Sequence, residues 1–305
     1  MNVPNAEELR VVADIPVGAK PAGVAVSVHD RVFVTNSGAD TVSVIDSSTN
    51  TVTATIDVGR RPESVATDPQ FGVCVANGGD NTVTMIDRLN AVIGTVSVEG
   101  PFHPPPAVVG VATDHQLSRA YVTNRGFGRV SIIDISGAPP PFAPHFIEVP
   151  GALGVAVDSV SHLAFVTRPD FDSVAVIDPA TDGVVATVPV RRQPTGIVVD
   201  AQRHRVLVAN SGFDTVSVID AGGGGVADVD VAAGPVGVTV DSRGNAYVTH
   251  VDGTVQVIDA ASHSVSATLP VGSRPEGLAF EPHSDRVYVA NSGDDTVSVI
   301  DLAAG

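Results

Sequence analysis

One sixteen-residue pattern recurs seven times along this chain of 305 residues. Its last copy reads RVYVANSGDDTVSVID at residues 286–301, and every copy closes on an aspartate. The closing aspartates are Asp46, Asp87, Asp134, Asp178, Asp220, Asp259 and Asp301. Successive copies lie 39 to 47 residues apart, which is the length of one four-stranded blade of a β-propeller. The repeats therefore predict a single domain built from seven blades.

Each unit divides into short apolar runs that are rich in β-branched residues and bounded by Gly, Pro, Asn or Asp, a pattern typical of strands. We number the four strands of a blade from the axis of the ring, as innermost, second, third and outermost. The predicted fold class is all-β, a seven-bladed β-propeller of four-stranded antiparallel blades. The expected blades span approximately residues 22–58, 63–98, 107–149, 152–190, 195–231, 236–271 and 276–301.

The ends of the chain predict how the ring closes. The sequence ends at Gly305, where the seventh blade still lacks its outermost strand. A strand-like run, LRVVADIPV, stands instead at residues 9–17. We expect this run to pair with the third strand of the last blade, which closes the ring three-plus-one and leaves few exposed edges.

Composition excludes several classes of function. The chain holds 34 acidic and 17 basic residues, a net charge of −17, which disfavours nucleic acid and anionic membranes as partners. A single cysteine excludes an internal disulfide. The first residues lack the basic and apolar segments of a signal peptide, and no run approaches the ~20 apolar residues of a membrane span. We expect a cytoplasmic monomer.

Aspartates also recur in the loops of nearly every blade. Asp and Asn side chains cap the backbone of turns, so we interpret these residues as structural. Calcium binding is the alternative, and the repetition in every blade argues against it. The sequence has no Cys/His spacing for zinc and no nucleotide-binding Gly motif before a helix. We therefore expect no metal and no organic cofactor.

The cores YVTN at 121–124 and YVAN at 288–291, the TVSVID runs and the turn VGSRPEG at 271–277 resemble the YVTN-type β-propeller repeat family. The resemblance covers nearly the whole chain. It implies the propeller fold, and it implies no catalytic motif. Members of that family include surface-layer proteins, periplasmic binding proteins and domains attached to redox enzymes, so the resemblance leaves the activity open.

Positions where the repeats differ are the candidates for chemistry. The second strand ends on Asn in five blades, but on Arg168 in the fourth and on His250 in the sixth. Antiparallel order places both on one end of the ring, which we call the top face. His103 lies there too, in an insertion between the second and third blades. Histidine can transfer protons near neutral pH and arginine can hold an anion. The alternative is that these are degenerate repeat positions facing water.

Aromatic residues cluster on the same face of a chain with only ten phenylalanines. Phe127, Phe171 and Phe213 occupy the loops between second and third strands in the third, fourth and fifth blades, and Phe102 lies in the neighbouring insertion. Exposed apolar clusters usually mark a ligand or a partner. The alternative is that each ring folds over its own loop.

Charged residues complete the candidate site. Arg125, Arg168 and Arg192 lie near the predicted phenylalanine arc, where they would suit an apolar ligand with an acidic group. Glu63 and Glu276 follow the turn prolines of the second and seventh blades, where a carboxylate could pair with His250 in acid–base chemistry. Both Pro-Glu pairs are also ordinary sequence for this type of repeat.

Two functions remain open on these residues. In the first, the top face holds a small-molecule pocket, with His250, His103, Glu63 and Glu276 as catalytic candidates for a lyase, cyclase, isomerase or hydrolase. Arg168, Arg125, Arg192 and the four phenylalanines would bind the substrate. In the second, the same face is a non-enzymatic surface for a protein partner. A redox or metal-associated accessory is a more distant third, because the chain lacks metal-ligand spacing.

Overall fold

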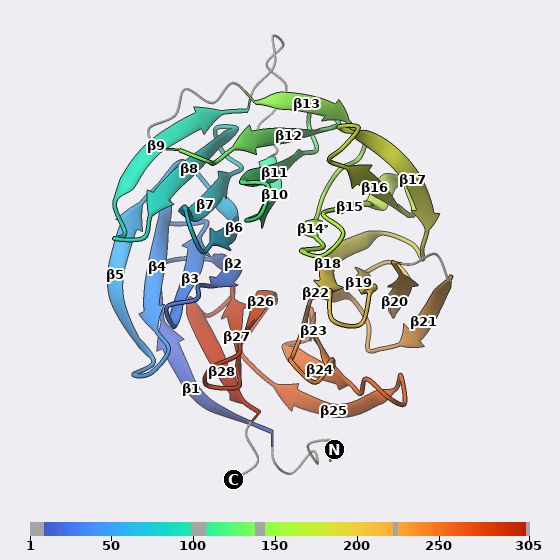
Figure 1. Ribbon diagram of the computed structural model, residues 1–305. Helices are drawn as coiled ribbons and strands as arrows, with labels where there is room; N and C mark the ends of the chain where they lie inside the picture. Colours follow the sequence, from blue (N-terminus) through green and yellow to red (C-terminus); the bar gives the residue numbers. More distant parts are fainter. Residues whose placement is uncertain (1–8, 99–107, 138–143, 222–224, 303–305) are drawn as a thin grey trace.

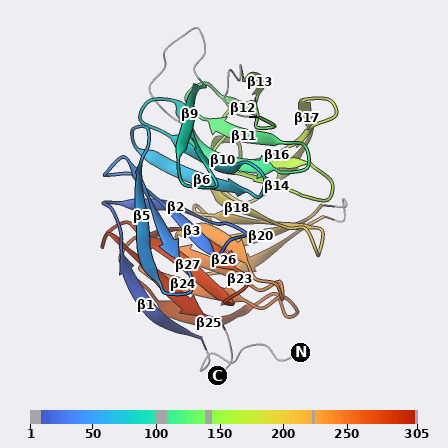
Figure 2. The same ribbon diagram turned by 60° about the vertical axis from the view of Figure 1, so that its left-hand side comes forward.

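The computed structural model describes residues 9–98, 108–137, 144–221 and 225–302. These residues form seven four-stranded antiparallel sheets, arranged as blades around a central channel (Figure 1). The innermost strands lie around the central axis of the ring and the outermost strands form its rim (Figure 1). Figure 2 shows the same ring of blades obliquely. The predicted seven-bladed β-propeller is therefore confirmed.

The first four blades follow the chain in order, each from its innermost strand outward. The first contains β2 (Pro21–Val26), β3 (Arg31–Asn36), β4 (Thr41–Asp46) and β5 (Thr51–Asp57). The second contains β6 (Pro62–Asp68), β7 (Gly72–Asn77), β8 (Thr82–Asp87) and β9 (Val92–Ser97). The third contains β10 (Val108–Asp114), β11 (Arg119–Asn124), β12 (Arg129–Asp134) and β13 (His145–Glu148). The fourth contains β14 (Val155–Val157), β15 (Ala164–Arg168), the short 3-10 helix η1 (Pro169–Phe171), β16 (Ser173–Asp178) and β17 (Gly183–Pro189).

The remaining blades complete the ring in the same direction. The fifth contains β18 (Pro194–Asp200), β19 (Arg205–Asn210), β20 (Thr215–Asp220) and β21 (Val226–Asp230). The sixth contains β22 (Pro235–Val240), β23 (Ala246–His250), β24 (Thr254–Ile258) and β25 (Val265–Pro270). The seventh contains β26 (Pro275–Glu281), β27 (Arg286–Asn291), β28 (Thr296–Asp301) and β1 (Arg10–Pro16).

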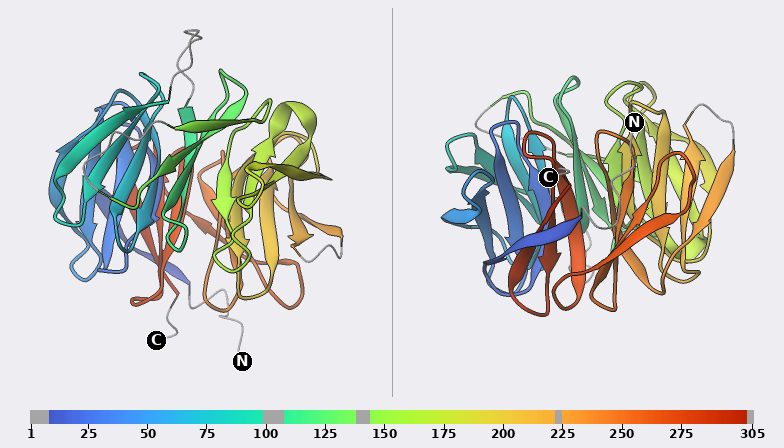
Figure 3. Two further views of the ribbon diagram at one scale, coloured as in Figure 1. Left: turned by 45° about the horizontal axis from the view of Figure 1, so that its top comes forward. Right: turned by 90° about the horizontal axis from the view of Figure 1, so that it is seen from below.

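The ring closes three-plus-one, as the two ends of the sequence predict. β1 runs antiparallel to β28, with Ile15 opposite Val297 and Pro16 opposite Thr296. The two strands, coloured dark blue and dark red, lie side by side in the right-hand view of Figure 3, where the ring is seen from its edge. Ile15 is only 4% exposed and belongs to one apolar cluster with Val297 and Val299. The first strand of the chain thus supplies the outer edge of the last blade.

Second and third strands are buried on both faces because neighbouring blades cover them. One apolar cluster combines Cys74 and Val83 of the second blade with Val122 and Ile133 of the third. Burial, with a smaller contribution from the charge of Asp68, raises the pKa of the Cys74 thiol to about 12. The single cysteine therefore stays a neutral core residue.

Glycines let the innermost strands approach one another around the channel. Six of the seven blades carry a glycine near the start of the innermost strand, namely Gly23, Gly110, Gly154, Gly196, Gly237 and Gly277. The second blade carries Ser64 at this position. A Cβ atom on Gly196 would lie 2.5 Å from the carbonyl oxygen of Val236 in the next blade. Side chains are therefore excluded here by the backbone of the neighbouring blade.

Threonines tie the third, fourth, fifth and sixth blades to the blade that follows each of them. The Thr167 hydroxyl accepts a hydrogen bond from the Gly154 N–H at 2.8 Å and donates to the Thr195 carbonyl of the fifth blade at 3.0 Å. In the fifth blade Ala209 replaces this threonine, and the Thr195 hydroxyl donates to the Val236 carbonyl at 3.0 Å instead. The hydrogen bond between blades is therefore present in both cases, although a threonine at a different position of the repeat donates it.

Loop aspartates cap the turns between blades. Asp40 of the first blade accepts the Arg61 N–H of the second at 2.7 Å, and Asp295 of the seventh accepts the Lys20 N–H of the first at 2.8 Å. Asp214 makes the same bond to the Gly234 N–H at 3.0 Å. These carboxylates have the structural role that the sequence predicts.

Candidate functional site

The innermost strands enclose a cavity of about 390 Å³ in the central channel. Its wall consists of glycine backbone and aliphatic side chains contributed by all seven blades. Among the described residues that line it, the charged ones are Glu63 and Glu276. Pockets that are mostly apolar with a few placed polar groups are typical small-molecule sites.

Equivalent positions of two blades supply these glutamates. Glu63 follows Pro62 at the start of β6, and Glu276 follows Pro275 at the start of β26. The first blade stands between them in the ring and carries Ala22 at the same position. Because each proline turn ends on the top face, both carboxylates enter the channel from its top end. The predicted placement of Glu63 and Glu276 at the channel is therefore found in the structure.

The carboxyl group of Glu63 has a raised pKa. Burial raises its pKa above the ordinary value of 4.5, and the nearby charge of Glu276 raises it further. Arg61 opposes both effects, since its Nε lies 2.7 Å from the Glu63 Oε1. Glu276 makes no hydrogen bond or ion pair through its carboxylate with the residues that the structure describes. The channel thus presents one paired and one unengaged carboxylate.

The structure places His250 away from the residues that line the channel cavity, so it does not show the expected pairing of His250 with Glu63 or Glu276. The His250 side chain is 0% exposed at the end of β23 and does not line the cavity. Neither ring nitrogen meets the criteria for a hydrogen bond with any residue that the structure describes. Burial lowers its pKa below 6.5, and the neighbouring backbone of Ala233 and Ala232 offsets this only in part. The sequence places His250 on the top face correctly, but its depth within the blade hides it from a ligand.

Arg168 likewise serves its own blade rather than the channel. Its Nε donates to the Pro150 carbonyl at 2.9 Å, and its guanidinium lies 4.2 Å from the centre of the Phe171 ring. The expected convergence of Arg168 and His250 on one cavity does not occur. Arg125 pairs with Asp170 at 2.8 Å on the surface, and Arg192 is exposed outside the channel lining.

The phenylalanine arc is present on the described part of the top face, and arginines stack on each ring. Phe127 lies 4.2 Å below the Arg129 guanidinium, which contacts Phe146 on its other side at 3.9 Å. Arg191 stacks on Phe213 at 5.2 Å. Phe171 and Phe213 nevertheless remain 52% and 50% exposed. Phe102 and His103 lie outside the described residues.

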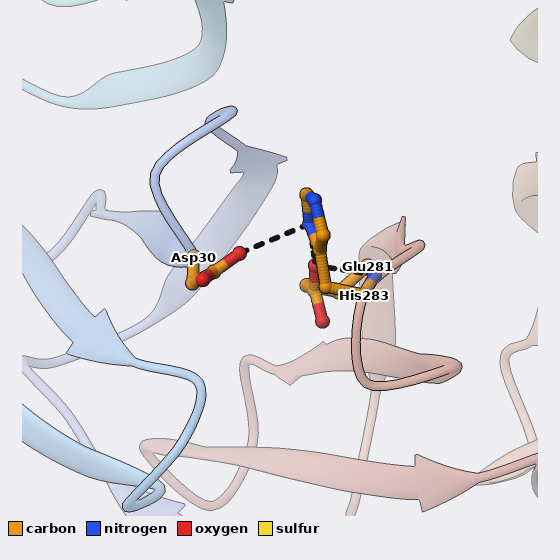
Figure 4. A group of neighbouring side chains, drawn as sticks. All are labelled: Asp30, Glu281 and His283. Carbon is orange, nitrogen blue, oxygen red and sulfur yellow. Dashed lines mark hydrogen bonds and ion pairs between the residues drawn. The ribbon is translucent and has the colours of Figure 1, made fainter.

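Asp30, Glu281 and His283 form a second cluster of ionisable groups, which the sequence does not single out (Figure 4). They lie at turns between innermost and second strands, on the opposite, bottom face of the ring. The His283 Nδ1 is 3.0 Å from the Asp30 Oδ1 and 3.2 Å from the Glu281 Oε1. Burial raises the pKa of Glu281, but hydrogen bonds from Ser284 and His283 lower it more, so the net direction is downward. Glu281 caps its turn through the His283 N–H at 2.9 Å, and His283 joins the seventh blade to the first. The signal for it is that Glu281 stands where other blades carry Asp.

Solved structures with the same fold include several enzymes. The chain superposes on hydrazine synthase of Kuenenia stuttgartiensis with a TM-score of 0.80 and 19% identity, covering 94% of this chain and 96% of that one. A virginiamycin B lyase from Staphylococcus aureus gives 0.82 and 13%, covering 97% and 100%. A streptogramin B lyase gives 0.83 and 13%, covering 99% and 100%. At these identities the likeness shows the seven-bladed fold alone.

Sequence comparisons place no family name on this fold. No protein-family model and no curated protein sequence matches the chain. Among the described residues, no helix is long and apolar enough to cross a membrane. The evidence for a function therefore comes from the residues that line the channel cavity.

Proposed function

We propose that this protein binds a small molecule at the top end of its central channel, with Glu63 and Glu276 as the polar recognition groups. The observation that carries the proposal is the chemistry of the cavity wall. Two carboxylates are the charged groups in a lining of about twenty residues that is otherwise glycine, aliphatic, Ser64 and Thr195. A cavity of about 390 Å³ falls in the size range of small-ligand sites.

The wall also defines the class of ligand. An apolar body would fill the aliphatic part of the channel, and a cationic or hydrogen-bond-donating group would meet the carboxylates. The acidic ligand expected from the arginines does not fit, because the charged groups lining this cavity are negative. Arg168 and Arg125 already have partners outside it.

Glu63 is the group best suited to proton transfer in this site. A carboxyl group whose pKa is raised by burial and by a second carboxylate is a typical general acid or base. We infer that any catalysis here is cofactor-free proton transfer, as in a lyase or isomerase. A virginiamycin B lyase, solved as a catalytically inactive histidine variant with quinupristin, has the same fold and is an example of a lyase among seven-bladed propellers.

Thermal-shift measurements test the proposal. We expect a panel of hydrophobic amines to contain ligands that stabilise the protein, while the corresponding carboxylic acids do not. At about 100 times its dissociation constant, a ligand adds about 2.7 kcal/mol to the free energy of unfolding. The Glu63→Gln/Glu276→Gln variant should lose this stabilisation.

The matched control is Asp57→Asn, which removes a carboxylate from the exposed outermost strand β5. This variant should keep the full shift. If amines stabilise the double variant as well as the wild type, or stabilise neither, the channel is not the binding site.

A protein-binding top face is the second candidate function. The half-exposed rings of Phe171 and Phe213 favour it, because such apolar groups on neighbouring blades often contact a partner. Capture of a partner by the wild type but not by a Phe171→Ser/Phe213→Ser variant would support this function.

A further inference from the structure

A second cavity, of about 520 Å³, lies on the bottom face between the second and third blades. Phe71, Leu89, Ile93 and Ile135 give it apolar walls, and Asp68 lines it as well. It is separate from the central channel, with which it shares no lining residue.

The cavity lies beside the second blade, one of three blades that lack an arginine at the start of the second strand. Four blades begin their second strand with Arg, and in three of them the guanidinium reaches the third-to-outermost turn of the next blade. Arg31 donates to Asn90 at 2.9 Å, Arg119 to Asp182 at 2.9 Å and Arg286 to the Ser47 carbonyl at 3.1 Å. The second blade has Gly72 at this position, and residues 135–137 of the next blade's turn line the cavity.

One carboxylate oxygen of Asp68 lacks the hydrogen-bond donor that aspartates at the same position have in other described blades. This aspartate is 5% exposed, and its Oδ1 accepts the N–H groups of Gln70 and Phe71, both at 2.8 Å. Its Oδ2 has no hydrogen-bond partner among the residues that the structure describes. The equivalent second oxygens are satisfied in other blades: Asp114 by His162 at 2.8 Å, Asp200 by Arg205 at 3.0 Å and Asp241 by Tyr247 at 3.2 Å. A buried carboxylate oxygen without a donor is costly, so a cation that reached it would be held firmly.

We propose that this pocket binds an alkylguanidinium group, which takes the place of the missing arginine. The guanidinium donates to Asp68, and the alkyl chain packs on Phe71, Leu89 and Ile93. Guanidinium suits this buried oxygen better than a point-like ammonium does, because its charge is delocalised and more weakly hydrated and is therefore less costly to bury. Asp87 and Arg88 also line the pocket, so the three charged residues there sum to −1 and favour a cation.

Isothermal titration calorimetry with n-propylguanidinium, the arginine side chain cut off at Cβ, tests this site. The wild type should bind it, and n-propylurea, which has a similar shape and no charge, should not bind. Asp68→Asn keeps the Oδ1 acceptor of the turn and removes the charge, and it should weaken binding at least about tenfold. Asp114→Asn is the matched control, because that carboxylate already has its histidine partner, and it should leave binding unchanged.

A second variant keeps the test valid if Asp68→Asn fails to fold. Restoring arginine at position 72 is unsuitable, since Gly72 has a φ of 134°. Ser136→Arg places a guanidinium on the exposed rim of the pocket instead, and it should abolish n-propylguanidinium binding. A blocked Gly-Arg-Gly peptide, titrated in parallel, distinguishes the source of the group. Binding of the peptide assigns the pocket to an arginine side chain, and binding of n-propylguanidinium alone assigns it to a small molecule.

Three results overturn the proposal: wild type that binds neither n-propylguanidinium nor the peptide, equal affinity for n-propylurea, or equal affinity in folded Asp68→Asn.

Discussion

Replacing Gly196 by valine will destabilise the protein by about 3 kcal/mol or more. A Cβ atom at this position lies 2.5 Å from the Val236 carbonyl oxygen and 2.8 Å from the Gly237 Cα. Both contacts are with the backbone of the next blade, so no side-chain rotation can relieve them. The innermost strands would have to separate, and the damage would extend to the channel they enclose.

Urea denaturation of matched glycine variants measures this effect. Gly183→Val is the control, because a Cβ atom on Gly183 meets nothing nearer than the Thr181 hydroxyl at 3.6 Å. This rim substitution should change the free energy of unfolding by about 0.5 kcal/mol or less. Equal losses in the two variants would show that the glycine ring does not limit the approach of the blades.

Introducing a charge at Ile15 will cost at least about 3 kcal/mol, because it buries an unpaired carboxylate in the seam that closes the ring. Ile15 is 4% exposed and packs in one cluster with Val299 and Tyr288. Among the strands that the structure describes, only β1 pairs with β28 at the outer edge of the seventh blade. We therefore expect Ile15→Asp to lower the free energy of unfolding of the whole ring.

Val12→Asp provides the comparison on the same strand. Val12 is 38% exposed and sits at the bulge between Val11 and Ala13, where the pairing with β28 shifts. Denaturation of this variant should differ from the wild type by about 1 kcal/mol at most. If Ile15→Asp is no more damaging than Val12→Asp, β1 does not hold the ring closed.

The sequence predicts the fold well because the strands of each repeat follow from local residue patterns. The run at residues 9–17 also provides the strand that the last repeat lacks. The membership in the YVTN-type repeat family, by contrast, stays a prediction. Turn-capping aspartates such as Asp40 were also predictable, since their role depends on neighbours in the adjacent unit at a fixed spacing.

The site was less predictable because repeat alignment gives the face of a residue and not its depth or partners. His250 and Arg168 differ from the repeat on the expected face, but one is buried and the other stacks on Phe171. The raised pKa of Glu63 could not be predicted from the sequence, because it is the balance of burial, the opposing charge of Arg61 and the charge of Glu276, two blades away in the ring.

One missed feature did leave a trace in the sequence. The loss of arginine at Gly72 is visible by aligning the repeats, but its consequence is an unpartnered Asp68, which only the three-dimensional arrangement reveals. A repeat position that loses a hydrogen-bonding side chain can therefore mark a site, just as a position that gains a reactive group can.

The most direct test of the channel site is a pH titration of the glutamate carboxyl carbons by NMR, with and without a stabilising hydrophobic amine. The chain has only seven glutamates, so single substitutions can assign their resonances. We expect Glu63 to titrate with a pKa above 4.5 in the free protein, and we expect this pKa to move back toward 4.5 in Glu276→Gln. When the amine binds, the carboxyl resonances of both Glu63 and Glu276 should change. A Glu63 that titrates at or below 4.5, and glutamate resonances at the channel that ignore the amine, would contradict the proposed function.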